Sequence, residues 1–252
     1  MTSISSEQER QHFVTHGWVK VDHLLGCTVL ELQQAVDEVA ALPEGGPWLH
    51  HREMTDSGPK LARTENFLPF SPLLNRVLAD GDIARVAGEL LGEEALIYKE
   101  KINYKLVGGA GFAPHQDQPA YPFVARVLSV MVAVDDATIA NGCLEVVSGA
   151  HGELLPQDER GCIDFGVVSE LNFQPLELRA GETLFFSALT PHRSGPNLSE
   201  RDRRALYPTY NGVSEGNLRD AYYAAKLEAF ADPASGDLVR LSLIQDFEGR
   251  AV

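Results

Sequence analysis

Residues 124–147, VARVLSVMVAVDDATIANGCLEVV, carry the clearest structural signal in the chain. Two apolar runs rich in β-branched residues, at 124–134 and 143–147, lie on either side of Asn141-Gly142, a dipeptide typical of tight turns. Similar runs occur before and after them, at 95–106, 175–179, 182–187 and 204–211. Short strands at this spacing, separated by turn residues, predict an antiparallel sandwich or barrel.

Helical patterns lie outside this β-rich region. One extends from Ser5 to His16, and a second begins at Thr28 and Glu31, which have the spacing of a capping box. Further helices are expected over 82–92 and 218–231. The chain is therefore expected to be mainly β, with α-helices flanking a sandwich or barrel core.

The domain organisation follows from these elements. Residues 43–60 are rich in Pro, Gly and polar side chains, which predicts a loop that could close over a site. Repeats and long linkers are absent from the sequence, so we expect one domain over 1–252. It would comprise a helical N-terminal part (1–94), a β-rich core (95–212) and a C-terminal helix and tail (213–252).

Composition and charge exclude several classes of protein. The 252 residues are 44% hydrophobic, which is enough for a sizeable core and excludes disorder as the main state. A formal net charge of −15 argues against nucleic acid or an anionic membrane as the partner. No apolar run is long enough to span a bilayer, and the polar start does not resemble a secretion signal. Three cysteines, Cys27, Cys143 and Cys162, are a poor disulfide framework, so a cytoplasmic protein is expected.

A candidate metal-ligating pattern lies within the strand-rich region. His115 and Asp117 form a His-x-Asp pair, and two positions apart on an extended strand they would point to one side. A third candidate, His192, ends an apolar run far downstream. Two histidines and one carboxylate are the facial triad of non-haem Fe(II) oxygenases. The alternative is two histidines in turns and a capping aspartate.

Arg203, eleven residues beyond His192, adds to this pattern. The segment Gly195-Pro196-Asn197 turns the chain, so the next strand could return and aim Arg203 into the same cavity. A guanidinium there could hold a carboxylate through two parallel hydrogen bonds. A co-substrate with a carboxylate at one end and a metal chelator at the other, such as 2-oxoglutarate, would need this arrangement.

Several motifs in order resemble those of the phytanoyl-CoA dioxygenase family, the Fe(II)/2-oxoglutarate-dependent oxygenases. The likeness is close from about 95 to 226 and loose over 13–42. The motifs are Ile102-Asn103-Tyr104-Lys105, Pro114-His115-Gln116-Asp117, Asn141 to His151, Gly181 to Phe186, Pro191 to Asn197, and Arg203-Arg204-Ala205.

The resemblance implies a fold and a reaction. The fold would be a double-stranded β-helix, the jelly-roll or cupin-like core, with Fe(II) held by His115, Asp117 and His192. The enzyme would use 2-oxoglutarate and O2 to hydroxylate an aliphatic C–H bond, releasing succinate and CO2. Halogenating relatives have a small residue in place of the carboxylate, so Asp117 favours hydroxylation.

The resemblance also implies how 2-oxoglutarate binds. Arg203 would pair with its far carboxylate, and Ser194 would donate a hydrogen bond to the same group. Asn103 would contact the co-substrate from its strand.

The substrate is expected to be small, polar and anionic. If Asn103 faces the interior of the barrel, alternation along the strand turns Lys101 the same way, and a lysine there needs an anionic partner. Such a partner could be a carboxylate, phosphonate or phosphate, unless the lysine reaches solvent at the mouth. Gln118 and Tyr121 are expected to line the same pocket. Lys-Glu-Lys-Ile-Asn-Tyr-Lys at 99–105, followed by a Gly-rich loop, looks like the aminoalkylphosphonate-hydroxylating branch of the family.

Alternative functions stay open from the sequence. A non-catalytic metal-binding jelly roll would need the triad but no dicarboxylate clamp, and a related oxygenase could act on a larger natural-product scaffold. A Ser-His-Asp hydrolase is disfavoured because no Gly-x-Ser-x-Gly motif is present. The partner is expected to be a small molecule. The helix over 218–231 could also support a homodimer.

Overall fold

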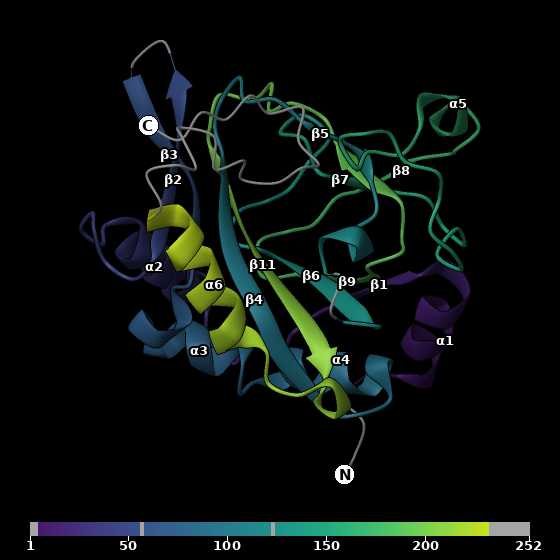
Figure 1. The fold of residues 1–252 in the computed structure, drawn as a ribbon, viewed down its shortest axis with the longest axis horizontal. Coiled ribbons are helices and arrows are strands. Elements are labelled where there is room, and N and C mark those ends of the chain that lie inside the picture. Colours follow the sequence, from purple (N-terminus) through teal and green to yellow (C-terminus); the bar gives the residue numbers. More distant parts are fainter. Residues whose placement is uncertain (1–4, 56–57, 122–123, 232–252) are drawn as a thin grey trace.

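Two antiparallel β-sheets face each other in the computed structural model, which describes residues 5–55, 58–121 and 124–231 (Figure 1). The larger sheet has the strand order β1-β9-β6-β11-β4-β3-β2, and the smaller one has the order β5-β10-β7-β8. The strands are β1 (Trp18–Val21), β2 (Leu49–Thr55), β3 (Gly58–Glu65), β4 (Ala95–Lys105), β5 (Phe112–His115), β6 (Val127–Ala133), β7 (Leu144–Val146), β8 (Gln174–Leu176), β9 (Thr183–Ser187), β10 (His192–Ser194) and β11 (Arg203–Gly212).

Helices cover the outer face of the larger sheet. The α-helices are α1 (Glu7–His16), α2 (Val29–Ala40), α3 (Pro72–Leu78), α4 (Asp82–Leu91), α5 (Phe165–Val168) and α6 (Arg219–Ala231), with short 3-10 turns at Leu68–Phe70, Gln118–Ala120 and Val213–Glu215. Apolar residues of α2, α3 and α4 form one buried cluster with the outward side chains of β4, β6, β9 and β11. No helix in the described ranges has the length and apolar character needed to cross a membrane.

The apolar stretch quoted first becomes the centre of this arrangement. Every residue of β6 is buried, because helices cover one face of the strand and the smaller sheet covers the other. A strand covered on both faces appears in sequence as a continuous apolar run rather than an alternating one. The mainly β sandwich with flanking helices is confirmed. The predicted helix starting at Thr28 is also present, and its capping box with Glu31 is formed.

The prediction of a loop over 43–60 is wrong for most of that segment. Residues Leu49–Thr55 and Gly58–Glu65 form the antiparallel pair β2 and β3, which extends the larger sheet beyond β4. The N-terminal part of the chain therefore contributes strands as well as helices. This extension brings polar side chains of β3 alongside β4.

Helix α6 packs against β4 (Figure 1). Its first residue, Arg219, forms an ion pair with the fully buried Glu100 at 2.6 Å. The Tyr223 hydroxyl donates to the carbonyl of Glu100 and accepts from its amide. These contacts fix the helix where β3 has ended and the edge of β4 would otherwise lie open.

Candidate active site

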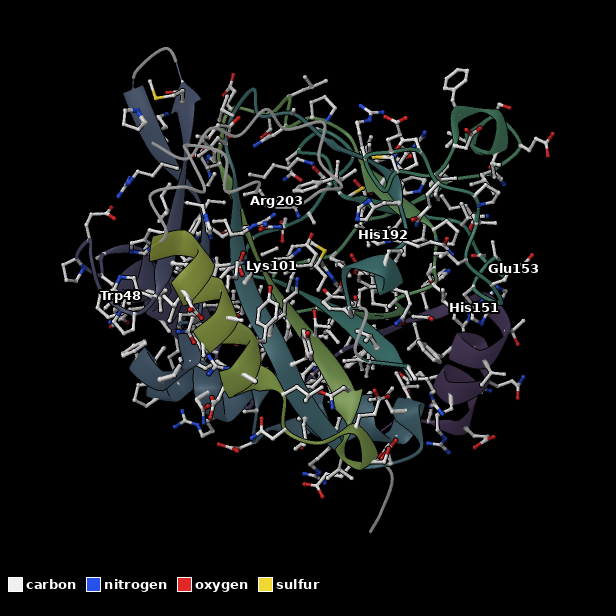
Figure 2. The ribbon with its side chains drawn as sticks, in the orientation of Figure 1. Trp48, Lys101, His151, Glu153, His192 and Arg203 are labelled. Atoms are coloured by element: carbon white, nitrogen blue, oxygen red, sulfur yellow. The ribbon has the colours of Figure 1, made fainter. Side chains whose placement is uncertain are left out.

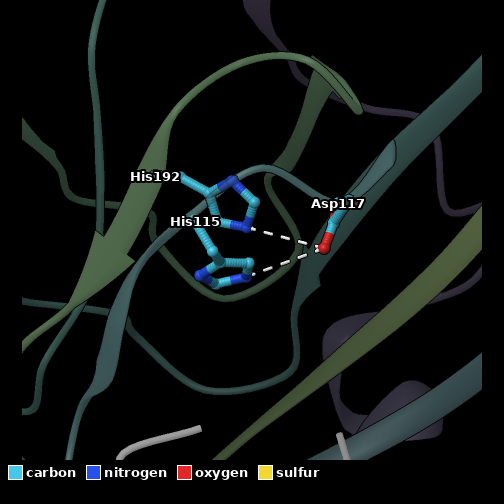
Figure 3. Close-up of side chains that lie close together, drawn as sticks. All are labelled: His115, Asp117 and His192. Atoms are coloured by element: carbon cyan, nitrogen blue, oxygen red, sulfur yellow. Dashed lines mark ion pairs between the residues drawn. The ribbon is translucent and has the colours of Figure 1, made fainter. Parts of the chain in front are cut away.

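The metal-ligating pattern converges between the two sheets (Figure 3). His115 ends β5 and His192 begins β10, and the two residues are directly paired across these antiparallel strands. The Nε2 atoms of His115 and His192 lie 3.7 Å and 3.8 Å from Asp117 Oδ1. The three ligand atoms all lie within 4.8 Å of one another, a spacing at which one metal ion could contact all three. No other such group of His, Cys, Asp and Glu occurs in the part of the chain that the structure describes.

Asp117 reaches this cluster in a different way from the one expected. Strand β5 stops at His115, and Asp117 has helical backbone angles, φ −75° and ψ −27°, at the start of a 3-10 turn. The two residues converge because the chain turns after the strand, not because they alternate along it. The convergence itself is as predicted.

Hydrogen bonds from the surrounding chain aim all three side chains. The Nδ1–H of His115 donates to the carbonyl of Ala113 at 2.7 Å, and that of His192 donates to the carbonyl of Thr190 at 2.9 Å. Each ring therefore presents Nε2 as its lone-pair nitrogen. The Ser129 hydroxyl donates to Asp117 Oδ2 at 2.6 Å, which leaves Oδ1 facing the imidazoles.

Burial and neighbouring charge favour the protonation states that bind a metal. Burial, followed by the nearby His192, lowers the pKa of His115 to about 3, so this imidazole is neutral at pH 7. Burial alone would raise the pKa of Asp117, but His192, His115 and Lys101 outweigh it and hold the pKa below its usual value. A neutral imidazole and an ionised carboxylate are the forms that donate electron pairs to a cation.

Gln116, between the two ligands, was not singled out from the sequence. Its side chain is fully buried, and its amide donates to the carbonyls of Glu153 and Leu189 and accepts from the amide of Leu155. The bond to Leu189 joins the His115 segment to the segment that leads to His192. Gln116 thus ties the ligand-bearing segments to each other.

Arg203 lies across the interior from His192 (Figure 2). The expected return of the chain beside the His192 strand is wrong, because β11 pairs with β4 and β6 in the opposite sheet. The facing of the two sheets nevertheless turns Arg203 into the same interior. Its side chain is 4% exposed, and Nε and Nη1 have no hydrogen-bond partner among the described residues. Two buried, unpaired donors on a guanidinium predict an anionic ligand.

Lys105, opposite Arg203 on β4, has all its donors engaged. Its ammonium donates to the carbonyls of Gly142 and Gly195 and to the Ser194 hydroxyl. This approach explains why position 142 is a glycine with φ +70°, since a Cβ there would lie 2.5 Å from the Lys105 ammonium. Ser194 also accepts from the amide of Phe112 at 3.3 Å, so its own O–H remains to donate to a ligand.

The interior face of β4 carries the residues expected there. Asn103 accepts a hydrogen bond from Arg63 Nε of β3 at 3.0 Å, which leaves its NH2 group as the part that could donate to a co-substrate. Lys101 lies next in the row, with its ammonium 5.5 Å from the centre of the Tyr207 ring. Burial, followed by the charges of Arg63 and Lys99, lowers the pKa of Lys101 to about 7.

The other two predicted substrate residues, Gln118 and Tyr121, differ in the hydrogen bonds that their side chains make within the chain. Gln118 donates its side-chain amide to the carbonyl of Val124 at 2.7 Å, so this side chain supports the loop after the triad. Tyr121 is buried, with its hydroxyl 3.3 Å from Thr209 Oγ1 and its ring 4.7 Å below the Lys99 ammonium. Lys101 and Tyr121 are both close enough to Asp117 and Glu65 for these two carboxylates to affect their pKa values. Lys101 is in turn paired with Glu65 across β4 and β3. We call the interior region bounded by the triad, Lys101 and Glu65 the chamber.

A double-stranded β-helix with two histidines and one carboxylate in its interior defines the class of non-haem iron oxygenases. Comparison with known proteins agrees with this class. Residues 13–205 match the phytanoyl-CoA dioxygenase (PhyH) family. A methylphosphonate hydroxylase from Gimesia maris is 40% identical over 99% of this chain and 98% of the relative. A 2-aminoethylphosphonate dioxygenase from an uncultured bacterium is 38% identical over 92% of this chain and 91% of the relative.

Solved structures agree at the level of the fold. The apo form of EctD from S. alaskensis superposes with a TM-score of 0.75 and 25% identity, over 84% of this chain and 79% of that one. The same protein solved with 2-oxoglutarate and 5-hydroxyectoine gives a TM-score of 0.73 at 24% identity, with 84% and 78% covered. The chain belongs to the phytanoyl-CoA dioxygenase family, and it is a dioxygenase of that family.

Proposed function

We propose that this protein is an Fe(II)/2-oxoglutarate-dependent hydroxylase that acts on an aliphatic C–H bond of a small organophosphonate. The observation that carries the proposal is the row of cations on the interior face of the larger sheet, Arg63, Lys99 and Lys101, beside the triad. Cations in the interior of a chain with net charge −15 require a function, and a dianionic substrate supplies one. The two phosphonate-oxidising relatives support the same class.

The residues present fit iron. His115, Asp117 and His192 offer two imidazole nitrogens and one carboxylate oxygen on one side, as a facial triad requires. When bound, iron(II) supplies the activation of O2 that breaks the C–H bond. The chain's own part is to present Nε2 of both rings and to hold Asp117 Oδ2 away from the metal through Ser129.

The residues also fit 2-oxoglutarate. Arg203 supplies the two buried donors for the far carboxylate, and Ser194 supplies a third from its O–H. Asn103 contacts the co-substrate through its amide in this proposal. The reaction places one atom of O2 in the substrate hydroxyl and the other in succinate, with loss of CO2, so atoms and electrons balance.

Substrate binding is assigned to Lys101 and Tyr121, and Gln118 would support the segment around Tyr121 through its hydrogen bond to Val124. Lys101 and Lys99 would pair with the phosphonate oxygens, and the buried ring of Tyr121 would exclude water from the carbon that reacts. A metal-storage jelly roll would leave the two donors of Arg203 without a purpose, which favours the enzyme. A large neutral natural-product scaffold would bring no anion for the interior lysines.

We further propose a cytoplasmic location, because Cys27, Cys143 and Cys162 are all free thiols, as a reducing compartment would keep them. A homodimer through α6 remains a prediction from the sequence, and the packing of α6 on β4 gives that helix a partner within the chain.

The test is substrate-dependent succinate formation by the purified protein with Fe(II), 2-oxoglutarate, O2 and ascorbate. Methylphosphonate is the first substrate, and acetate at the same concentration is the matched non-phosphonate anion. We expect succinate and a hydroxylated phosphonate in equal amounts. Turnover of 2-oxoglutarate that no small phosphonate accelerates would contradict the proposed substrate class.

A further inference from the structure

Glu65, at the end of β3, is a buried carboxylate that no part of the proposed reaction uses. It is 2% exposed and faces Lys101 across β3 and β4. One of its oxygens lies 3.7 Å from Arg63 Nη1 and 3.7 Å from His51 Nε2. Its other oxygen accepts a hydrogen bond from the Lys226 ammonium at 2.5 Å. Because this buried carboxylate lies directly beside Lys101, the residue proposed to bind the phosphonate, Glu65 is where a positively charged part of the same substrate would be expected to bind.

The chain itself fills that place. Lys226 comes from α6, 161 residues from Glu65 in sequence, and its side chain is 19% exposed. Its ammonium lies 5.6 Å from the centre of the Tyr222 ring and 3.4 Å from the Tyr222 hydroxyl. The helix is fixed to β4 through the pair of Arg219 with the buried Glu100. Lys226 is therefore a primary ammonium delivered to a buried carboxylate by an anchored helix.

The charges around Glu65 are strongly unbalanced. Four cations, Arg63, Lys99, Lys101 and Lys226, influence this one carboxylate. His51 adds no charge at pH 7, because burial lowers its pKa to about 3. A substrate ammonium would meet a carboxylate that is already paired with Lys226, together with the positive charges of Arg63, Lys99 and the protonated form of Lys101. A phosphonate dianion would meet an excess of positive charge.

We propose that Lys226 occupies the position on Glu65 that a substrate ammonium would take, so that the chamber selects small phosphonates without an amino group over aminoalkylphosphonates. This inference rests on the proposed function, and it narrows the substrate within the phosphonate class. The named substrate of one phosphonate-oxidising relative lacks an amino group, and that of the other carries one on a chain one carbon longer.

The test compares kcat/KM for methylphosphonate and 2-aminoethylphosphonate in the wild type and in Lys226→Met, which keeps an unbranched side chain against Tyr222 but removes the charge. We expect the wild type to prefer methylphosphonate at least tenfold. Lys226→Met should reduce that preference at least tenfold, mainly by lowering KM for the amino substrate. Lys226→Arg should keep the preference, and Lys60→Met, which removes a charge from the exposed part of β3, should leave it unchanged.

A double variant assigns the gain to Glu65. If the substrate ammonium takes the place of Lys226, the gain of Lys226→Met disappears when Glu65→Gln is added. Lys226→Gln replaces Lys226→Met if circular dichroism shows that the methionine variant does not fold.

The outcomes separate the two proposals. A wild type that oxidises 2-aminoethylphosphonate as well as methylphosphonate overturns the inference and leaves the proposed function intact. An unchanged preference in folded Lys226→Met and Lys226→Gln also overturns it. A wild type that oxidises neither phosphonate removes the proposed function and the inference with it.

Discussion

Arg203 and Glu65 are buried charged side chains at two ends of the chamber, and they differ in whether the described residues provide a partner for them. At one end, Arg203 is buried with two donors unpaired, and its neighbour Lys105 is fully engaged by Gly142, Ser194 and Gly195. At the other end, the carboxylate of Glu65 is already paired with a lysine of the chain. The Arg203 end, proposed to bind a ligand anion, has hydrogen-bond donors without a partner in the part of the chain that the structure describes. The Glu65 end, proposed to exclude a ligand cation, has its carboxylate neutralised by a lysine of the chain.

The metal cluster lies between these ends and belongs to neither pattern. His115 and His192 each donate one hydrogen bond to a backbone carbonyl, of Ala113 and of Thr190. Asp117 accepts one from the Ser129 hydroxyl. The orientation of His115, Asp117 and His192 is therefore fixed by two backbone carbonyls and one hydroxyl and not by charged side chains. Substitutions in the triad, at the Arg203 end and at the end formed by Glu65 and Lys101 should therefore have separable effects on kinetics.

The largest effect on activity is expected from substitution of a triad residue. His192→Ala removes one of three ligand atoms, so metal binding and substrate-dependent succinate formation should both be abolished. His16→Ala, which changes a histidine of α1, is the matched control and should retain activity. Binding of Fe(II) or Co(II), followed by absorption spectroscopy, measures the first property independently of turnover. Full metal binding by His192→Ala would place the metal elsewhere.

At the Arg203 end, Arg203→Met should mainly raise KM for 2-oxoglutarate. Two charge-assisted hydrogen bonds of about 1.5 kcal/mol each correspond to an increase of roughly 100-fold. Arg204→Met is the matched control, since Arg204 lies next in β11 but pairs with Asp135 and Asp37 on the outer side. If Arg203→Met and Arg204→Met have the same KM for 2-oxoglutarate, Arg203 does not bind its carboxylate.

The comparison also explains what could be read from the sequence. The apolar runs of β6 and β9 and the convergence of His115 and Asp117 were predictable, because a strand buried on both faces and a His-x-Asp pair are local signals. Strand β3 was missed, since its buried face carries Arg63 and Glu65 and faces a polar chamber. Buried polar residues in a strand have the same appearance in sequence as a solvated loop.

Other parts of the site depend on contacts that sequence spacing does not contain. Lys226 meets Glu65 only because α6 packs against the edge of β4. Arg203 was assigned to the right cavity for the wrong reason, since β11 joins the sheet opposite His192. Local patterns thus pointed to the three candidate metal ligands, whereas the contacts behind the proposed substrate selectivity depend on tertiary packing.

Substitution of Ser129 tests how the side chain of Asp117 is oriented. We assign Ser129 as a positioning residue, because its hydroxyl donates to Asp117 Oδ2 at 2.6 Å and so acts through the carboxylate of a candidate metal ligand. Ser129→Ala should weaken metal binding about 10–100-fold, the range typical of lost hydrogen bonds to metal ligands. Activity at saturating Fe(II) should largely recover, and Ser129→Thr should restore affinity. If metal affinity in Ser129→Ala equals that of the wild type, the hydroxyl has only a packing role.

The smallest effect expected, and the one that compares the two ends most directly, is on pH dependence. Burial lowers the pKa of both Lys101 and Lys105 to about 7, so each ammonium is present below pH 7 and is lost as the pH rises through it. Between pH 6 and 8 the protonated fraction falls about tenfold, and KM for the phosphonate should rise by up to that factor. Lys101→Arg stays charged, so it should flatten the profile for the phosphonate relative to the wild type and leave that for 2-oxoglutarate unchanged. The ratio of the two enzymes cancels ionisation of the substrate itself, and a ratio that is constant with pH would mean that Lys101 does not bind the anion.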